Sequence, residues 1–200
     1  MLVNFKKKII FCFIYFLLSN CSYQNTKTSN LHIIHLENIK KIELKVASYR
    51  VENNHNINKK KSTELQGFEK SLQNSFTDWA NKKFTLVGEK NNIVMYINQA
   101  EILIEEVKKN KGIKKIIFFE EQKRYLVLLK IILSFTDEDL STADLNINGE
   151  IDFFIKDNTS INDRKRLLNK AIKKLIVSVD KNLNENIKKN TFKRYLSRIN

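Results

Sequence analysis

Residues 143–156, ADLNINGEIDFFIK, carry the clearest alternating pattern in the chain. One set of alternate positions is polar or acidic and consists of Asp144, Asn146, Asn148, Glu150 and Asp152. The other set is mostly apolar and consists of Leu145, Ile147, Gly149, Ile151, Phe153 and Ile155. A period of two is that of a β-strand with one buried and one solvated face, which is typical of an antiparallel sheet covered on one side.

Three further segments alternate in the same way and predict three more strands. Residues 122–136 place Tyr125, Val127, Leu129, Ile131, Leu133 and Phe135 in one row. Their other row holds Leu126, Leu128 and Ile132, so we expect this strand to be central and covered on both faces. Residues 92–107 are expected to place Val94, Tyr96, Ala100, Ile102 and Ile104 on one face, and residues 40–51 predict the first strand.

Two segments have helical periodicity. Residues 62–83 place Leu65, Phe68, Leu72, Phe76 and Trp79 on one stripe, and we favour a core position for Trp79 over a ligand platform. A second helix opens at Ser160 and has a longer stripe, formed by Leu168, Ile172, Leu175, Val179, Leu183 and Ile187. The sequence therefore predicts an α+β domain, with two helices packed on one face of a four-stranded, mostly antiparallel sheet in the order β-α-β-β-β-α.

Two segments outside these elements leave alternatives open. Ile116–Phe119 is an apolar run that either continues a hairpin into the core or forms an exposed contact surface; we favour the core. Residues 192–200 combine Tyr195 and Leu196 with basic side chains. This tail either lies on a membrane surface or packs against the domain.

The first residues, MLVNFKKKIIFCFIYFLLSNC, have the layout of an export signal. Three lysines precede a ten-residue apolar run, which suits a signal peptide and is too short to span a membrane. We expect residues 1–20 to be a signal peptide, residues 21–39 to be a modified cysteine and flexible tether, and residues 40–200 to form a single domain. Only Cys21 would remain after cleavage, so no disulfide is expected.

Leu18-Ser19-Asn20-Cys21 resembles the lipobox of bacterial lipoproteins, although Asn20 stands where that motif has Gly, Ala or Ser. The resemblance implies a lipoprotein cleaved before Cys21, with lipid on the Cys21 thiol and acylation of the new amino group by chains such as palmitate. Several acyl chains on one residue give stable membrane anchoring. An ordinary secretory signal and an uncleaved anchor are the alternatives.

The chain is strongly basic, with a formal net charge of +14. Residues 161–200 contribute twelve basic and three acidic side chains. A basic surface suits anionic lipid headgroups or an envelope protein partner, and an exported chain is not expected to meet nucleic acid. The candidate contact residues are Lys173, Lys174, Lys188, Lys189, Lys193 and Arg194, with a solvated helix face as the alternative.

No motif in the chain marks out catalytic residues, a metal or a cofactor. His32 and His35 have H-x-x-H spacing but lack further ligands, and His55 lies in an asparagine-rich loop. Asp137, Glu138 and Asp139 lack the spacing of a calcium loop. We therefore expect a protein without catalytic residues, metal or cofactor.

The element order together with the lipobox resembles the lipopolysaccharide-assembly lipoprotein and the auxiliary lipoproteins of envelope ABC transporters. A family of uncharacterised bacterial lipoproteins is also similar, at Trp79, Gly88, Ala100, Glu101, Gln122, Tyr125, Tyr195 and Leu196. These resemblances imply a non-catalytic envelope protein at the periplasmic side of the outer membrane, assisting assembly or transport. The alternatives are a passive spacer and a periplasmic hydrolase that uses Asp144, Glu150 and Asp152, of which only Glu150 and Asp152 lie close enough to share a site.

Overall fold

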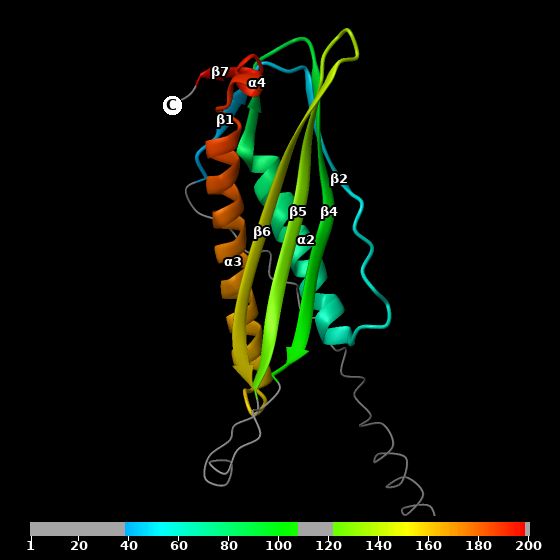
Figure 1. Ribbon diagram of the computed structural model, residues 1–200, viewed down its shortest axis with the longest axis vertical. Coiled ribbons are helices and arrows are strands. Elements are labelled where there is room, and N and C mark those ends of the chain that lie inside the picture. The colour runs from blue at the N-terminus through cyan, green and yellow to red at the C-terminus, as the bar shows by residue number, and fades with distance from the viewer. Residues whose placement is uncertain (1–38, 108–121, 199–200) are drawn as a thin grey trace, which may run out of the picture. The chain divides into compact units, whose positions relative to one another are not determined.

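The computed structural model describes residues 39–107 and 122–198. The signal segment, Cys21, the tether, His32, His35 and the Ile116–Phe119 run lie outside the described residues. Figure 1 shows the long strands of the sheet side by side, with the long helices next to them.

The main sheet has the strand order β2-β4-β5-β6. Its members are β2 (Ser48–Asn53), β4 (Asn92–Glu106), β5 (Gln122–Thr136) and β6 (Thr142–Lys156). The β4–β5 and β5–β6 pairings are antiparallel, and β2 runs parallel to β4. Helices α2 (Thr63–Lys83) and α3 (Ile161–Asn186) contact the sheet mainly at β4 and β6, respectively. The predicted α+β class is therefore confirmed.

A second, smaller sheet was not predicted. It has the order β3-β1-β7, with β1 (Ile42–Leu44), β3 (Phe84–Leu86) and β7 (Leu196–Arg198). The predicted first strand is thus divided between two sheets, because the backbone at residues 45–47 bonds to other partners: the Lys45 amide donates to the Tyr195 carbonyl and the Ala47 amide to that of Lys90.

The C-terminal tail packs against the domain. After the short helix α4 (Asn190–Lys193), β7 pairs antiparallel with β1. Phe192, Tyr195 and Leu196 are buried, and the rings of Phe192 and Tyr195 lie 5.1 and 4.6 Å from that of Phe135. The amphipathic composition of the tail therefore reflects a helix and strand with one side in the core.

The core lies between the inner face of the sheet and the two long helices. Trp79 is 1% exposed, and its indole N–H donates to Asp180 of α3 at 3.0 Å, so its core position is confirmed. Lys83 is also fully buried, with an ion pair to Asp180 at 2.7 Å and a hydrogen bond to the Lys40 carbonyl. Burial lowers the pKa of Lys83, against the opposing effect of Asp180. These contacts tie α2 to α3 and to the start of the domain.

The predicted face of β4 is wrong in its first half. A register shift between Ile97 and Gln99 inserts an extra residue opposite β5. The inward residues are consequently Ile93, Met95 and Ile97 before the shift, then Ala100 and Ile102 after it. Val94 and Tyr96 therefore belong to the outer face, because a bulge reverses the alternation of all residues beyond it.

Beyond the end of β2, side chains form the hydrogen bonds to the β4 backbone that a neighbouring strand would form. The last residue pair between these strands is Asn53 with Ile97, so no described strand lies beside the rest of β4 on that side. There the Ile102 amide donates to Glu69 Oε1 at 2.9 Å, and Lys61 Nζ donates to the Ile102 carbonyl at 3.1 Å. Lys61 also contacts Glu69 and Glu101, at 2.6 and 2.8 Å. We call Lys61, Glu69 and Glu101 the edge clamp.

Contacts within the edge clamp shift the pKa values of Lys61 and Glu101. Burial alone would lower the pKa of Lys61, but hydrogen bonds to Glu101 and Glu69 outweigh it and raise that pKa. Hydrogen bonds from Lys61 and Gln99 lower the pKa of Glu101. Each of these two shifts favours the charged form, so Lys61 and Glu101 are ionised at neutral pH.

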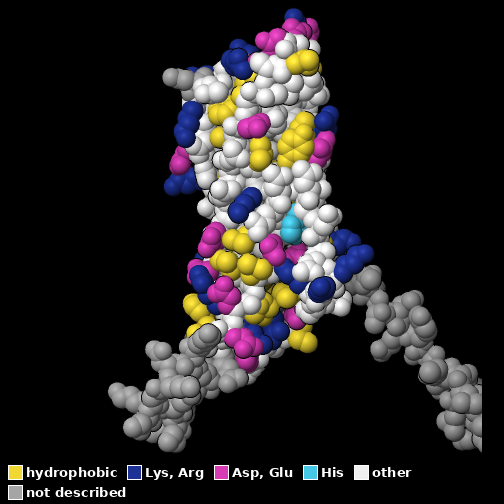
Figure 2. All heavy atoms as spheres, turned by 45° about the vertical axis from the view of Figure 1, so that its right-hand side comes forward, with side chains coloured by type: hydrophobic (Ala, Val, Ile, Leu, Met, Phe, Trp, Pro, Cys, Tyr) yellow, Lys and Arg dark blue, Asp and Glu magenta, His cyan; other side chains and the backbone are white. Residues whose placement is uncertain are grey.

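The outer face of β5 is open among the described residues. The prediction that β5 is central is confirmed, since β4 and β6 flank it. The expected cover of the second face is not supplied by any described element, and Leu126, Leu128 and Ile132 are partly buried there. Figure 2 shows that hydrophobic side chains on the viewed surface lie among acidic and basic ones.

Candidate ligand-binding cavity

A cavity of about 360 Å³ opens where both long helices begin. Ser62 caps α2 by accepting a hydrogen bond from the Leu65 amide at 3.4 Å, and Ser160 caps α3 by accepting one from the Asp163 amide at 3.1 Å. These serines stand where a side-chain oxygen can satisfy a free helix N–H. The ends of β4, β5 and β6 form the opposite wall.

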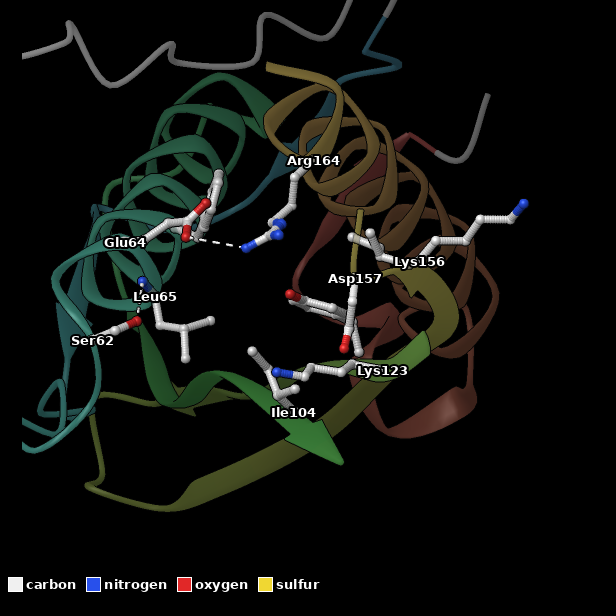
Figure 3. Close-up of a pocket in the computed structure, with 11 residues that line it drawn as sticks. Ser62, Glu64, Leu65, Ile104, Lys123, Lys156, Asp157 and Arg164 are labelled. Carbon is white, nitrogen blue, oxygen red and sulfur yellow. Dashed lines mark hydrogen bonds and ion pairs between the residues drawn. The ribbon is translucent and has the colours of Figure 1, made fainter. Parts of the chain in front are cut away.

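The cavity has an apolar lining with charged groups around it. The apolar part comes from Leu65, Phe68, Ile104, Tyr125 and Ile155, and the charged residues are Glu64, Lys123, Lys156, Asp157 and Arg164. Figure 3 shows Arg164 reaching from α3 toward Glu64 of α2, with Lys123 on the sheet side, whereas Lys156 extends away. Arg164 and Lys123 are thus the cations placed nearest to a molecule in the cavity.

Arg164 has a hydrogen-bond donor that no described residue uses. Its Nη1 lies 3.5 Å from Glu64 Oε2, at the long limit of a hydrogen bond. Arg164 Nε and Glu64 Oε1 are both buried and have no hydrogen-bond partner among the described residues. Because an unsatisfied buried polar atom is costly, a ligand that accepts a hydrogen bond from Nε is stabilised here.

Tyr125 adds a neutral polar group to the lining. Burial raises the pKa of its phenol, an effect that Arg164 opposes and that Glu64 and Asp157 reinforce. The hydroxyl therefore stays protonated at neutral pH and is able to donate a hydrogen bond. The arrangement suits a ligand with an anionic group and an apolar part.

The structure distributes the predicted contact residues over two places away from this cavity. Lys173 and Lys174 are exposed on α3, whereas Lys188, Lys189 and Lys193 are exposed after its end. The twelve helical residues that follow Lys174 up to the end of α3 at Asn186 correspond to about 18 Å, so the two groups do not form one patch. Arg194 pairs with Asp137 at 2.8 Å and donates to the Tyr195 hydroxyl at 2.7 Å, which fastens the tail to the β5–β6 turn.

The acids considered for hydrolysis lie on the outer row of β6. Asp144, Glu150 and Asp152 are exposed, and Asp152 pairs with Arg124 of β5 at 3.0 Å. Within the described ranges, no group of three or more His, Cys, Asp or Glu is placed to hold a metal ion. None of the described helices is long and apolar enough to cross a membrane.

The cavity is not predictable from the sequence alone. Its residues come from five separate elements, and none of them forms a local motif. The signal that was available is the pair of serine caps, because two helices beginning at the same end of a sheet bring their first turns together. Nothing in the sequence distinguishes Arg164, in the first turn of α3, from the basic residues Lys165 and Arg166 that follow it.

No protein-family model matches the chain, and no curated protein sequence matches it. Among solved structures, the chain is similar to a minor lipoprotein from Acinetobacter baumannii (TM-score 0.37, 10% identity, covering 70% of this chain and 92% of that one). It is also similar to a putative neuraminyllactose-binding hemagglutinin homolog from Helicobacter pylori (TM-score 0.39, 17% identity, 82% and 94%). A third is rare lipoprotein B from Shewanella oneidensis (TM-score 0.32, 6% identity, 70% and 95%). Similarities of this size assign no function to the chain.

Proposed function

We propose that the protein is a non-catalytic lipoprotein of the bacterial cell envelope, anchored by lipid on Cys21 and facing the periplasm from the outer membrane. In this proposal its domain assists envelope assembly or transport by binding an anionic lipid, with a protein partner as the second ligand class. The lipobox resemblance supports the anchor. The cavity between the starts of α2 and α3 supports the lipid.

The observation that carries the lipid assignment is the combination of an apolar lining with the unsatisfied Arg164 Nε. A phosphate headgroup accepts charge-assisted hydrogen bonds from a guanidinium. Glycerol and the first acyl carbons would contact Leu65, Phe68 and Ile104. Two helix N-termini at the same end add partial positive charge, although Glu64 and Asp157 offset part of it.

The anchor is tested by intact mass measurement of the membrane-bound protein beside a Cys21→Ala variant. We expect a chain that begins at Cys21 and carries acyl chains, and we expect the variant to lack this form. An unmodified chain, or one cut elsewhere, contradicts the anchor.

The lipid site is tested with a soluble short-chain lipid, which avoids binding through the anchor. Calorimetric titration of the full chain with dihexanoyl phosphatidylglycerol should show binding that dihexanoyl phosphatidylcholine lacks. Arg164→Gln should weaken that binding about tenfold, because it removes a charge-assisted hydrogen bond.

Lys181→Gln is the matched control, since Lys181 is an exposed cation of the same helix that lies outside the cavity. Equal weakening by both substitutions would mean that general helix charge attracts the lipid. No binding to the unsubstituted chain would contradict the lipid assignment. The spacer alternative predicts that result.

A further inference from the structure

Strand β6 forms one outer edge of the main sheet, and it is long and regular. It pairs with β5 from Thr142↔Thr136 to Lys156↔Gln122 without a register shift. Its fifteen residues correspond to roughly 50 Å of extended chain. In an antiparallel pair, every second residue points its backbone N–H and C=O away from the partner strand, so β6 presents a row of such groups on its other side.

None of the described residues bonds to this outer backbone row between residues 143 and 155. No described strand pairs with β6 other than β5, and no side-chain contact takes the place that the edge clamp has at β4. The strand also has no proline and no bulge, which are usual ways of preventing edge pairing. The edge is therefore able to accept an additional strand.

The acidic side chains on the solvent-facing side of β6 indicate which side chains an added strand would need. Asp152 already pairs with Arg124, but Asp144 faces Ser134 across the sheet and Glu150 faces Leu128. Asp144 and Glu150 thus have no cation opposite them on β5. They share one face and are six residues apart, so Lys or Arg residues spaced by six on an added strand would face both.

The inner side of the edge is apolar. Leu145 and Ile147 are buried under α3, and a Cβ on Gly149 would lie only 2.6 Å from Val179 Cγ2. On α3, Asp180 faces α2 and Leu175 faces the sheet. Helical spacing then puts Leu167 on the side of α3 that faces away from α2, where it is 37% exposed. The inner side chains of an added strand would lie beside this flank.

We propose that the free edge of β6 binds an extended segment of a partner protein by strand addition. That segment is amphipathic, with Lys or Arg six residues apart on its outer row and apolar side chains on its inner row. Backbone hydrogen bonds provide most of the affinity, and Asp144 and Glu150 select the sequence. A second copy fits less well, because two-fold pairing centred on Ile147 places Asp144 opposite Glu150. Asp144 and Glu150 lie outside the lipid cavity, which β6 reaches only through Ile155 and Lys156, so the proposal does not depend on lipid binding.

The test uses the full chain and a labelled peptide, Lys-Val-Thr-Val-Thr-Val-Lys, blocked at both ends. Its two lysines are six residues apart on one face and its valines form the other. We expect fluorescence anisotropy to show binding, and hydrogen exchange to show new protection of β6 amides. The same peptide with both lysines replaced by glutamate should bind about tenfold more weakly.

A charge exchange on the protein makes the test specific. The Asp144→Lys, Glu150→Lys double variant should reverse the preference and bind the glutamate peptide more tightly than the lysine peptide. Arg164→Gln, which alters the lipid cavity, should bind the lysine peptide as the unsubstituted chain does. Thermal unfolding of each variant checks that the fold is retained.

Three results would overturn the proposal. The first is no binding of the lysine peptide at millimolar concentration. The second is binding that the double variant leaves unchanged, which would place the peptide elsewhere. The third is protection of β6 amides that rises with protein concentration alone, since that result would identify a second copy as the occupant.

Discussion

The two sides of the main sheet differ in how the backbone of their long strands, β4 and β6, is bonded. Beyond the end of β2, β4 is closed by the edge clamp, in which a carboxylate and an ammonium bond to the backbone of Ile102. On the opposite side β6 has no such closure within the described residues. Closing the β4 edge takes the charged groups of Lys61 and Glu69 largely out of water, which has a desolvation cost that the exposed acids of β6 do not carry.

The largest expected effect comes from breaking the closed edge. Lys61→Met leaves Glu69, whose side chain is fully buried, without its cation. Removing one partner of a buried ion pair typically costs about 3–5 kcal/mol, and we expect a loss of that size in the free energy of unfolding measured with urea.

Lys90→Met is the matched control for Lys61→Met, because Lys90 pairs with Glu138 at the surface, where both side chains are well exposed. Its expected effect is below about 1 kcal/mol. Similar losses for the two variants would show that the clamp is no more important than a surface pair.

The next effect concerns the packing of β6 against α3. Gly149→Val adds atoms where Val179 and Leu175 already lie within 3 Å of an added Cβ. Overpacking of this kind costs about 1–3 kcal/mol, and thermal unfolding should report it. Gly67→Ala is a suitable control, because nothing lies within 4 Å of a Cβ there. A neutral Gly149→Val would mean that α3 moves freely away from β6.

A smaller effect is expected from the acid titration of the clamp. The pKa of Glu101 is lowered in the folded protein, so the unfolded chain binds this proton first as pH falls. Its contribution to stability is therefore complete above the usual pKa of 4.5 and is lost as pH falls through the lower folded value. Urea unfolding between pH 7 and pH 3 should show a shallower acid loss for Glu101→Gln than for the unsubstituted chain. Parallel curves would contradict the assignment.

The smallest effect is expected at the open edge. Asp144→Lys and Glu150→Lys change exposed side chains that face no charge on β5. Each should alter the free energy of unfolding by less than about 0.5 kcal/mol. A large loss would show that these acids stabilise the fold, and it would remove the reason for assigning them to a partner.

The strands and helices that alternate over many residues were predictable from the sequence. The segment now seen as β5 was predicted with its observed bounds, and both long helices begin at their serine caps. These elements are determined locally, by the period of the apolar residues and by capping. The same local rule also predicted Trp79 in the core.

The remaining features depend on contacts between distant segments, which periodicity does not report. The bulge at Ile97 shifts the faces of β4 without any glycine or proline to mark it. Apolar residues on the outer row of β5 predicted a cover that the described elements do not supply. The cavity and the edge clamp each combine side chains from several elements, and a lysine-rich composition hid Lys61 and Arg164 among many similar residues.

The small sheet has a consequence for the order in which the domain folds. Strand β1 is made first, yet Leu44 pairs with Leu196 of β7, which is made last. Such distant pairs form slowly, because a long loop must close before the contact stabilises anything. Strand β1 is able to pair with β3 earlier, but its pairing with β7 waits until residue 196 has emerged. A chain released before its last few residues would lack the strand that completes this sheet.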